Sequence, residues 1–141
     1  MSELSLLERL DEEDLNLIIM SKRGLLYSSR DRGINPLIDA IDSLGIRKLQ
    51  DSTVVDRIIG KASALLICHF NAKNALAKLM SAKGADVLKE KGIGYYAEAS
   101  TRDIKDKTKT DICPFEKIVL QVNSPSEAYK LLKEAGSNRL K

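Results

Sequence analysis

Cys113 is the residue whose type and position point most directly to chemistry. It stands immediately before Pro114, a residue that commonly occupies the first position of a helix. Backbone N–H groups at such a helix start stabilise anions, so a thiolate placed there could act as a nucleophile. The alternative is a small residue packed beneath the preceding loop, because no base is defined beside it. The single histidine, His69, is expected at the far end of another helix, where it is more simply structural.

Asp56 is the second candidate, and it is expected near the first turn of a long helix over residues 53–68. A carboxylate there suits the helix dipole and could also serve as a general acid or base. Gly60 lies four residues on, on the same helical face. A glycine inside a helix costs about 1 kcal/mol relative to alanine, so it indicates that another backbone or a ligand approaches closely. The sequence leaves both interpretations open.

Three further residues are candidates for binding. Ser81 follows an expected strand and begins an expected helix, a place where α/β folds collect ligands, although an ordinary helix cap explains it equally. Glu116 stands three residues after Cys113 and could complete that helix cap. Lys61 points away from Asp56 on a helix, and a surface ion pair is its simplest role. With Gly60, these residues are expected to line a small-molecule pocket in which Asp56 and Cys113 are catalytic.

The elements that position these residues follow from apolar periodicity and turn signals. The sequence predicts helices over 1–13, 35–44, 53–68, 83–91 and 125–136, strands over 15–20, 25–29, 74–80 and 93–98, a polar loop over 99–111, and a frayed tail over 137–141. A further apolar segment, introduced by Cys113 and Pro114, extends to Val122. Strands joined through helices favour parallel pairing, and the hairpin at 15–29 adds an antiparallel pair. We therefore expect an α/β protein of three layers, with a mixed sheet of four strands, or five, between helices.

Composition limits the class of protein. With 141 residues the chain fits one domain spanning 1–141, and 23 basic residues are interspersed with 20 acidic ones. No basic patch with aromatic residues is evident, so nucleic-acid binding is not expected. The longest apolar run, residues 62–70, is too short to span a membrane. Two cysteines and the lack of a signal peptide favour the cytoplasm.

The predicted order of elements resembles the cytidine deaminase-like fold, in which an antiparallel hairpin precedes two strands separated by a helix. The chain is more closely similar to a small prokaryotic family of unknown function assigned to that fold. The residues that carry this resemblance are Arg32-Gly33-Ile34 with Pro36-Leu37, Val54-Val55-Asp56 with Gly60-Lys61-Ala62, and Cys113-Pro114-Phe115-Glu116.

The resemblance does not extend to the zinc site of true deaminases. Those enzymes place His/Cys-x-Glu at one helix start and Pro-Cys-x-x-Cys at the next. The corresponding segments here are Val54–Arg57 and Ser81–Ala85, which contain neither His nor Cys, although Asp56 could stand in for the carboxylate proton shuttle. We therefore expect no zinc, no other metal and no cofactor.

Three functions remain open from the sequence. The first is a metal-independent enzyme that uses Asp56 as acid or base and Cys113 as nucleophile. The second is a non-catalytic or regulatory domain that binds a nucleotide-like or other small polar ligand. The third is a structural module that associates with itself through a sheet edge or helix, for example as a homodimer.

Overall fold

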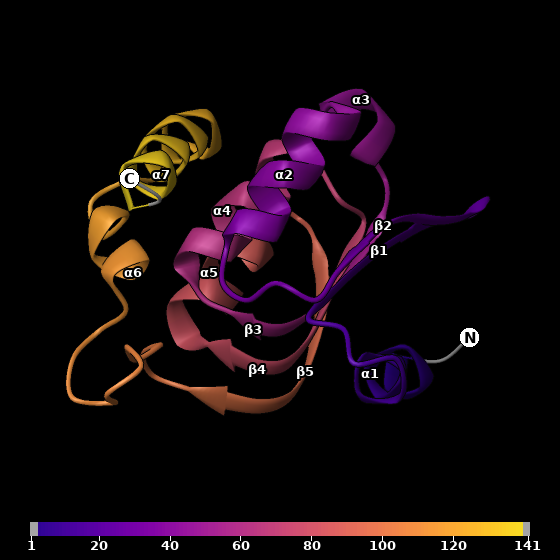
Figure 1. Ribbon diagram of the computed structural model, residues 1–141, viewed down its shortest axis with the longest axis horizontal. Helices are drawn as coiled ribbons and strands as arrows, with labels where there is room; N and C mark the ends of the chain where they lie inside the picture. The colour runs from indigo at the N-terminus through magenta and orange to yellow at the C-terminus, as the bar shows by residue number, and fades with distance from the viewer. Residues whose placement is uncertain (1–2, 140–141) are drawn as a thin grey trace.

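The computed structural model describes residues 3–139 and shows a five-stranded mixed sheet in the order β2-β1-β3-β4-β5 (Figure 1). The strands are β1 (Leu17–Ser21), β2 (Gly24–Ser29), β3 (Thr53–Ile59), β4 (Asn74–Ser81) and β5 (Gly94–Thr101). The β1–β2 hairpin and the β1–β3 pair are antiparallel, whereas β3, β4 and β5 run parallel. The prediction of an α/β protein with a mixed sheet is confirmed, and the sheet has five strands, the larger of the two predicted numbers.

The fifth strand comes from a segment that was expected to be helical. Residues 53–59 form β3, and the helix begins only at Lys61, so the prediction of one helix over 53–68 was wrong. Five of the seven residues of β3 are β-branched, and such side chains lose less freedom in an extended chain than in a helix. Gly60 is consequently not inside a helix but in the turn between β3 and α4 (Lys61–His69).

Helices cover the two faces of the sheet unequally. Among the described helices, α1 (Glu3–Glu12) is the one on the first face, where its leucines pack on Ile18, Val55 and Leu76 (Figure 1). The opposite face carries the larger core, formed with α4 and with α2 (Asn35–Leu44), α5 (Ala82–Glu90) and α7 (Pro125–Arg139). Two short helices, α3 (Ile46–Leu49) and α6 (Pro114–Ile118), complete the helices of the described residues. Of the described helices, none is long and apolar enough to cross a membrane.

Several boundaries differ from the sequence prediction. β5 continues through Thr101 into the segment expected to be loop, and α6 ends at Ile118 instead of reaching Val122. α7 continues to Arg139, so residues 137–139 of the expected tail are helical, and residues 140–141 lie outside the described part. The N-terminal helix spans 3–12, and the remaining expected residues 1–2 also lie outside it. Helix ends depend on local caps that periodicity does not define.

The parallel strands determine where a site can form. β3 leads into α4 and β4 leads into α5, so the N-termini of both helices lie at the carboxyl ends of neighbouring strands. Open α/β sheets bind ligands at this edge, because exposed backbone N–H groups gather there.

Candidate functional site

Gly60 lies at the centre of the carboxyl edge of the sheet, and its lack of a side chain creates space for another residue. Its backbone is extended, a conformation that any residue could adopt, so backbone freedom does not require glycine here. A Cβ atom at this position would lie 2.2 Å from Oε1 of Glu116 and 2.8 Å from a carbon of Ile104. The close approach inferred from the sequence is therefore present, although the neighbours are two side chains.

Glu116 fills the space above Gly60 and caps α4. Its carboxylate accepts hydrogen bonds from the backbone N–H groups of Lys61 (2.8 Å) and Ala62 (2.7 Å), and its side chain is buried. These N–H groups have no partner inside the helix, and the helix dipole favours negative charge beside them. Glu116 was expected to cap its own helix, α6, but it caps a helix that is more than fifty residues earlier in the chain.

Ser81 caps the neighbouring helix α5, as the sequence indicated. Its hydroxyl oxygen accepts a hydrogen bond from the N–H group of Gly84 at 3.0 Å. A Cβ atom at Gly84 would lie only 3.0 Å from the backbone of Ile59 and Gly60. The two helix starts therefore pack against each other, and small residues at this contact bring their N–H groups to one place.

Charged groups surround these two helix starts. The Lys83 ammonium and the Arg102 guanidinium lie 3.5 Å and 3.6 Å from the Asp103 carboxylate, and the Lys61 ammonium donates to the Leu120 carbonyl oxygen at 3.2 Å. Between them is a cavity of about 10 Å³, room for about one water molecule. We call it the α4–α5 cavity, and it is lined by Lys61, Ser81, Lys83, Arg102, Asp103, Ile104, Ile112, Glu116 and Leu120.

The α4–α5 cavity brings together Lys61, Ser81 and Glu116, with Gly60 directly beside Glu116. The sequence did not single out its other charged residues, Lys83, Arg102 and Asp103. Their signal is positional: Lys83 lies in the first turn of the helix after β4, and the other two follow the end of β5. These three residues could therefore be recognised only once the ends of β4 and β5 were known.

Asp56 is not at a helix start, and this expectation was wrong. It lies within β3, between Leu17 of β1 and Ala77 of β4, and is buried. Burial raises the pKa of its carboxyl group to about 7, although the N–H groups of Arg57 and Ile58 donate hydrogen bonds to it. Asp56 does not line the α4–α5 cavity. The catalytic role suggested for it by the sequence stays a prediction.

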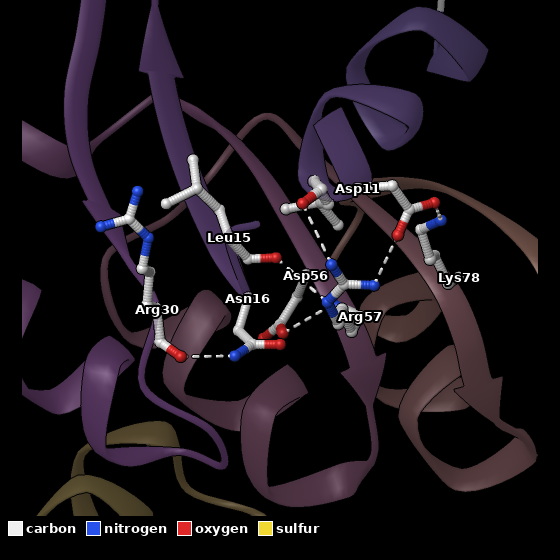
Figure 2. A network of polar contacts seen from close by, with 8 residues as sticks. Asp11, Leu15, Asn16, Arg30, Asp56, Arg57 and Lys78 are labelled. Carbon is white, nitrogen blue, oxygen red and sulfur yellow. Dashed lines mark hydrogen bonds and ion pairs between the residues drawn. The ribbon is translucent and has the colours of Figure 1, made fainter. Parts of the chain in front are cut away.

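Arg57, the next residue, points to the opposite face and attaches α1 to the sheet (Figure 2). Its guanidinium donates to the carbonyl oxygens of Leu10 and Leu15, both at 3.0 Å, and to the Asp11 carboxylate at 2.8 Å. Lys78 of β4 pairs with the same carboxylate. Lys78 and Arg57 together hold the pKa of Asp11 below its ordinary value. This network explains why polar residues are present beneath α1.

Cys113 precedes α6, as expected, but its side chain does not cap that helix. The thiol is half-buried, and the Cys113 backbone N–H donates to the carbonyl oxygen of Ile104 at 2.9 Å. The residue thereby ties α6 to the segment that follows β5, and it does not line the α4–α5 cavity. His69 ends α4 and stacks on Tyr129 with 5.0 Å between ring centres. Its position at the opposite end of α4 from Glu116 supports the structural interpretation.

Metal ligands do not gather at this edge. Within residues 3–139, no group of three or more His, Cys, Asp or Glu side chains could hold a metal ion. Of the two segments matched to zinc motifs, Ser81–Ala85 does begin a helix, whereas Val54–Arg57 lies in β3. The residues present therefore do not fit the zinc site of a deaminase.

The fold and the site define an α/β protein whose polar cavity lies at the carboxyl edge of a mixed sheet. Residues 5–135 match a family model described as TM1506, domain of unknown function (DUF1893), and the chain belongs to this family. It is similar to the crystal structure of a DUF1893 family protein (TM1506) from Thermotoga maritima. That comparison has a TM-score of 0.84 at 25% identity and covers 94% of this chain and 88% of the other. The comparison with curated proteins finds no match.

Proposed function

We propose that this domain binds a small anionic ligand at the carboxyl edge of β3 and β4, where the ligand replaces the carboxylate of Glu116. The observation that carries the proposal is the pair of N–H groups of Lys61 and Ala62, which already hold a carboxylate from a distant segment. A helix start that binds one carboxylate can bind another carboxylate or a phosphate. Glu116 would then occupy the site when no ligand is bound.

The charges around the α4–α5 cavity support an anionic ligand. Three basic side chains, Lys61, Lys83 and Arg102, line it together with two acids. Arg102 is almost fully exposed, with a side-chain exposure of 94%, so it is free to reorient toward a ligand. The present cavity holds about one water molecule, and a larger ligand therefore requires α6 to move away from α4.

We favour binding over catalysis because the proposed catalytic pair lies outside the cavity. Neither Asp56 nor Cys113 lines it, and Asp56 already bonds to its own strand. The assignment to the cytidine deaminase-like fold remains part of this proposal, and it rests on the hairpin followed by strands that alternate with helices. A ligand at the carboxyl edge is compatible with that fold and does not require zinc.

Titration with inorganic phosphate tests the proposal. We expect weak binding by the unchanged protein and at least roughly tenfold tighter binding by Glu116→Ala, because the internal competitor is removed. Lys83→Ala, added to Glu116→Ala, should weaken binding again. Glu134→Ala removes an exposed carboxylate from α7 and should change nothing. Calorimetry that detects no phosphate binding by Glu116→Ala would refute the site.

A further inference from the structure

β5 forms one border of the sheet and lacks the usual protection of an edge strand (Figure 1). Sheets normally guard their edges with charges, prolines, bulges or short strands. β5 is eight residues long, pairs with β4 without a register shift, and contains one charged residue, Glu98, and no proline. The opposite border, β2, has six residues and a register irregularity against β1 at Ile19 and Met20. The two edges of the same sheet therefore differ in their protection.

The two tyrosines of β5 expose apolar area on both faces of this edge. Tyr95 is 44% exposed and Tyr96 is 43% exposed. Tyr95 pairs with Ala75, which belongs to the larger core, and Tyr96 pairs with Leu76, which lies under α1. The rings therefore lie on opposite faces. An open groove of about 520 Å³ runs beside them, and several of its lining residues are small: Ala82, Ala85, Ala97 and Ser100.

We propose that two copies of this chain pair through β5, antiparallel about a two-fold axis at Ala97, and form one continuous ten-stranded sheet. Residues opposite each other in such a pair must lie on the same face of the sheet. The two-fold axis therefore lies midway between two copies of the same residue. An axis at Glu98 would place two carboxylates directly opposite each other, which is unfavourable. The axis at Ala97 instead places Tyr96 opposite Glu98 of the second copy.

Hydrogen bonding and shape are complementary in this register. The Tyr96 hydroxyl can donate to the Glu98 carboxylate of the second copy, and the two-fold axis repeats the contact. On the other face, Tyr95 lies opposite Ala99 of the second copy, beside the groove between α5 and β5. The tyrosine ring thus meets small side chains and buries apolar area that one copy leaves exposed. The pairing also satisfies the outward backbone groups of β5.

A charge exchange across the proposed pair tests the inference on the full chain. Sedimentation equilibrium should give twice the chain mass of 15.6 kDa. Tyr96→Glu places a second carboxylate opposite Glu98 at two equivalent positions and should raise the dimer Kd roughly tenfold or more. Adding Glu98→Lys turns the repulsion into attraction and should restore the dimer. Leu25→Glu makes a comparable change on exposed β2 and should have no effect.

The same measurement can overturn the proposal. A mass of 15.6 kDa at every concentration would exclude pairing, and a dimer that Tyr96→Glu leaves unchanged would place the interface elsewhere. Oxidative cross-linking tests the register, because an axis at Ala97 brings its two Cα atoms to about 4.5–5.5 Å, within disulfide range. Ala97→Cys should therefore cross-link efficiently and Ala99→Cys should not. The reverse result would reject the axis at Ala97.

Discussion

Asp56 is a carboxylic acid buried within the sheet, so its protonation and the folding of the protein depend on each other. Burial raises its pKa from 3.8 to about 7. The folded state then binds a proton that the unfolded chain has already released between these two pH values. Proton binding by Asp56 therefore stabilises the folded state. This stabilisation is complete below about pH 4 and is lost as the pH rises through 7. The shift corresponds to a free energy on the order of 4 kcal/mol.

We predict that Asp56→Asn removes this part of the pH dependence. An amide keeps an oxygen that can accept the Arg57 N–H but carries no charge that burial would penalise. The variant should match the unchanged protein within about 1 kcal/mol at pH 4 and exceed its stability at pH 8 by a few kcal/mol. Urea unfolding across this pH range measures both. Asp86→Asn, an exposed change on α5, is the control, and a large loss of stability at both pH values would contradict the prediction.

The two cysteines should differ in reactivity. Cys68 is buried in the larger core, and burial raises the pKa of its thiol to about 11. Cys113 is half-buried beside the segment that follows β5. We predict that iodoacetamide modifies Cys113 faster than Cys68 in the native protein, because the thiolate is the reactive form and must be accessible. Mass spectrometry of timed digests measures the two rates. The unfolded protein is the control, in which the two thiols should react at equal rates. Equal alkylation rates of Cys68 and Cys113 in the native protein as well would refute the prediction.

At the scale of elements, Glu116 connects α6 to the start of α4. We predict that Glu116→Gln lowers the free energy of unfolding by about 0.5–2 kcal/mol, because the amide accepts fewer N–H groups and lacks the charge that the helix dipole favours. Glu127→Gln is the matched control, since Glu127 lies exposed in the first turn of α7. Chemical denaturation measures both variants. An unchanged stability for Glu116→Gln would mean that the cap contributes little.

Gly60 and Glu116 should behave as one coupled unit. Gly60→Ala places a Cβ atom 2.2 Å from the Glu116 carboxylate and should cost about 1–3 kcal/mol, because that side chain must move. In a Glu116→Ala background the space is free, so the same change should cost less. A double-mutant cycle by denaturation measures the difference. Additive costs would show that Gly60 is required for another reason, such as contact with Ile104.

At the scale of the whole molecule, α1 is the layer held by the fewest elements. It lies alone on its face of the sheet, and the polar side of its contact depends on Arg57 (Figure 2). We predict that Arg57→Met lowers the free energy of unfolding by about 1–3 kcal/mol, since three charge-assisted hydrogen bonds are lost. Hydrogen exchange should also accelerate selectively in Glu3–Glu12.

Lys78→Met is the comparison for Arg57→Met. Lys78 contacts the same Asp11 carboxylate but binds neither the Leu10 nor the Leu15 carbonyl oxygen that Arg57 reaches, so its loss should cost less. Equal effects of the two variants would indicate that α1 is held on the sheet by the ion pairs with Asp11 and not by the hydrogen bonds from Arg57 to the Leu10 and Leu15 carbonyl oxygens. Both are measured by the same unfolding and exchange experiments.

Local signals in the sequence determined those parts of the fold that depend on neighbouring residues. The hairpin, the cap at Ser81 and the helix that begins at residue 125 were predicted, and the hydroxyl of the preceding Ser124 accepts the N–H of Glu127. Such turns and caps involve residues two or three positions apart, so residue type alone defines them. The mixed α/β class followed from the order of these elements.

Tertiary structure decided the state of residues 53–59 and the composition of the site. The apolar residues of β3 fit a helical period as well as a strand, and only pairing with β1 and β4 on both sides distinguishes them. The meeting of Glu116 with Lys61 and Ala62 joins residues 54 and 55 positions apart, which no local pattern specifies. The sequence by itself therefore supplied most of the elements and three polar residues of the α4–α5 cavity: Lys61, Ser81 and Glu116. Which candidates share a site was decided by long-range packing, because side-chain contacts between distant segments exist only once the sheet and its helices assemble.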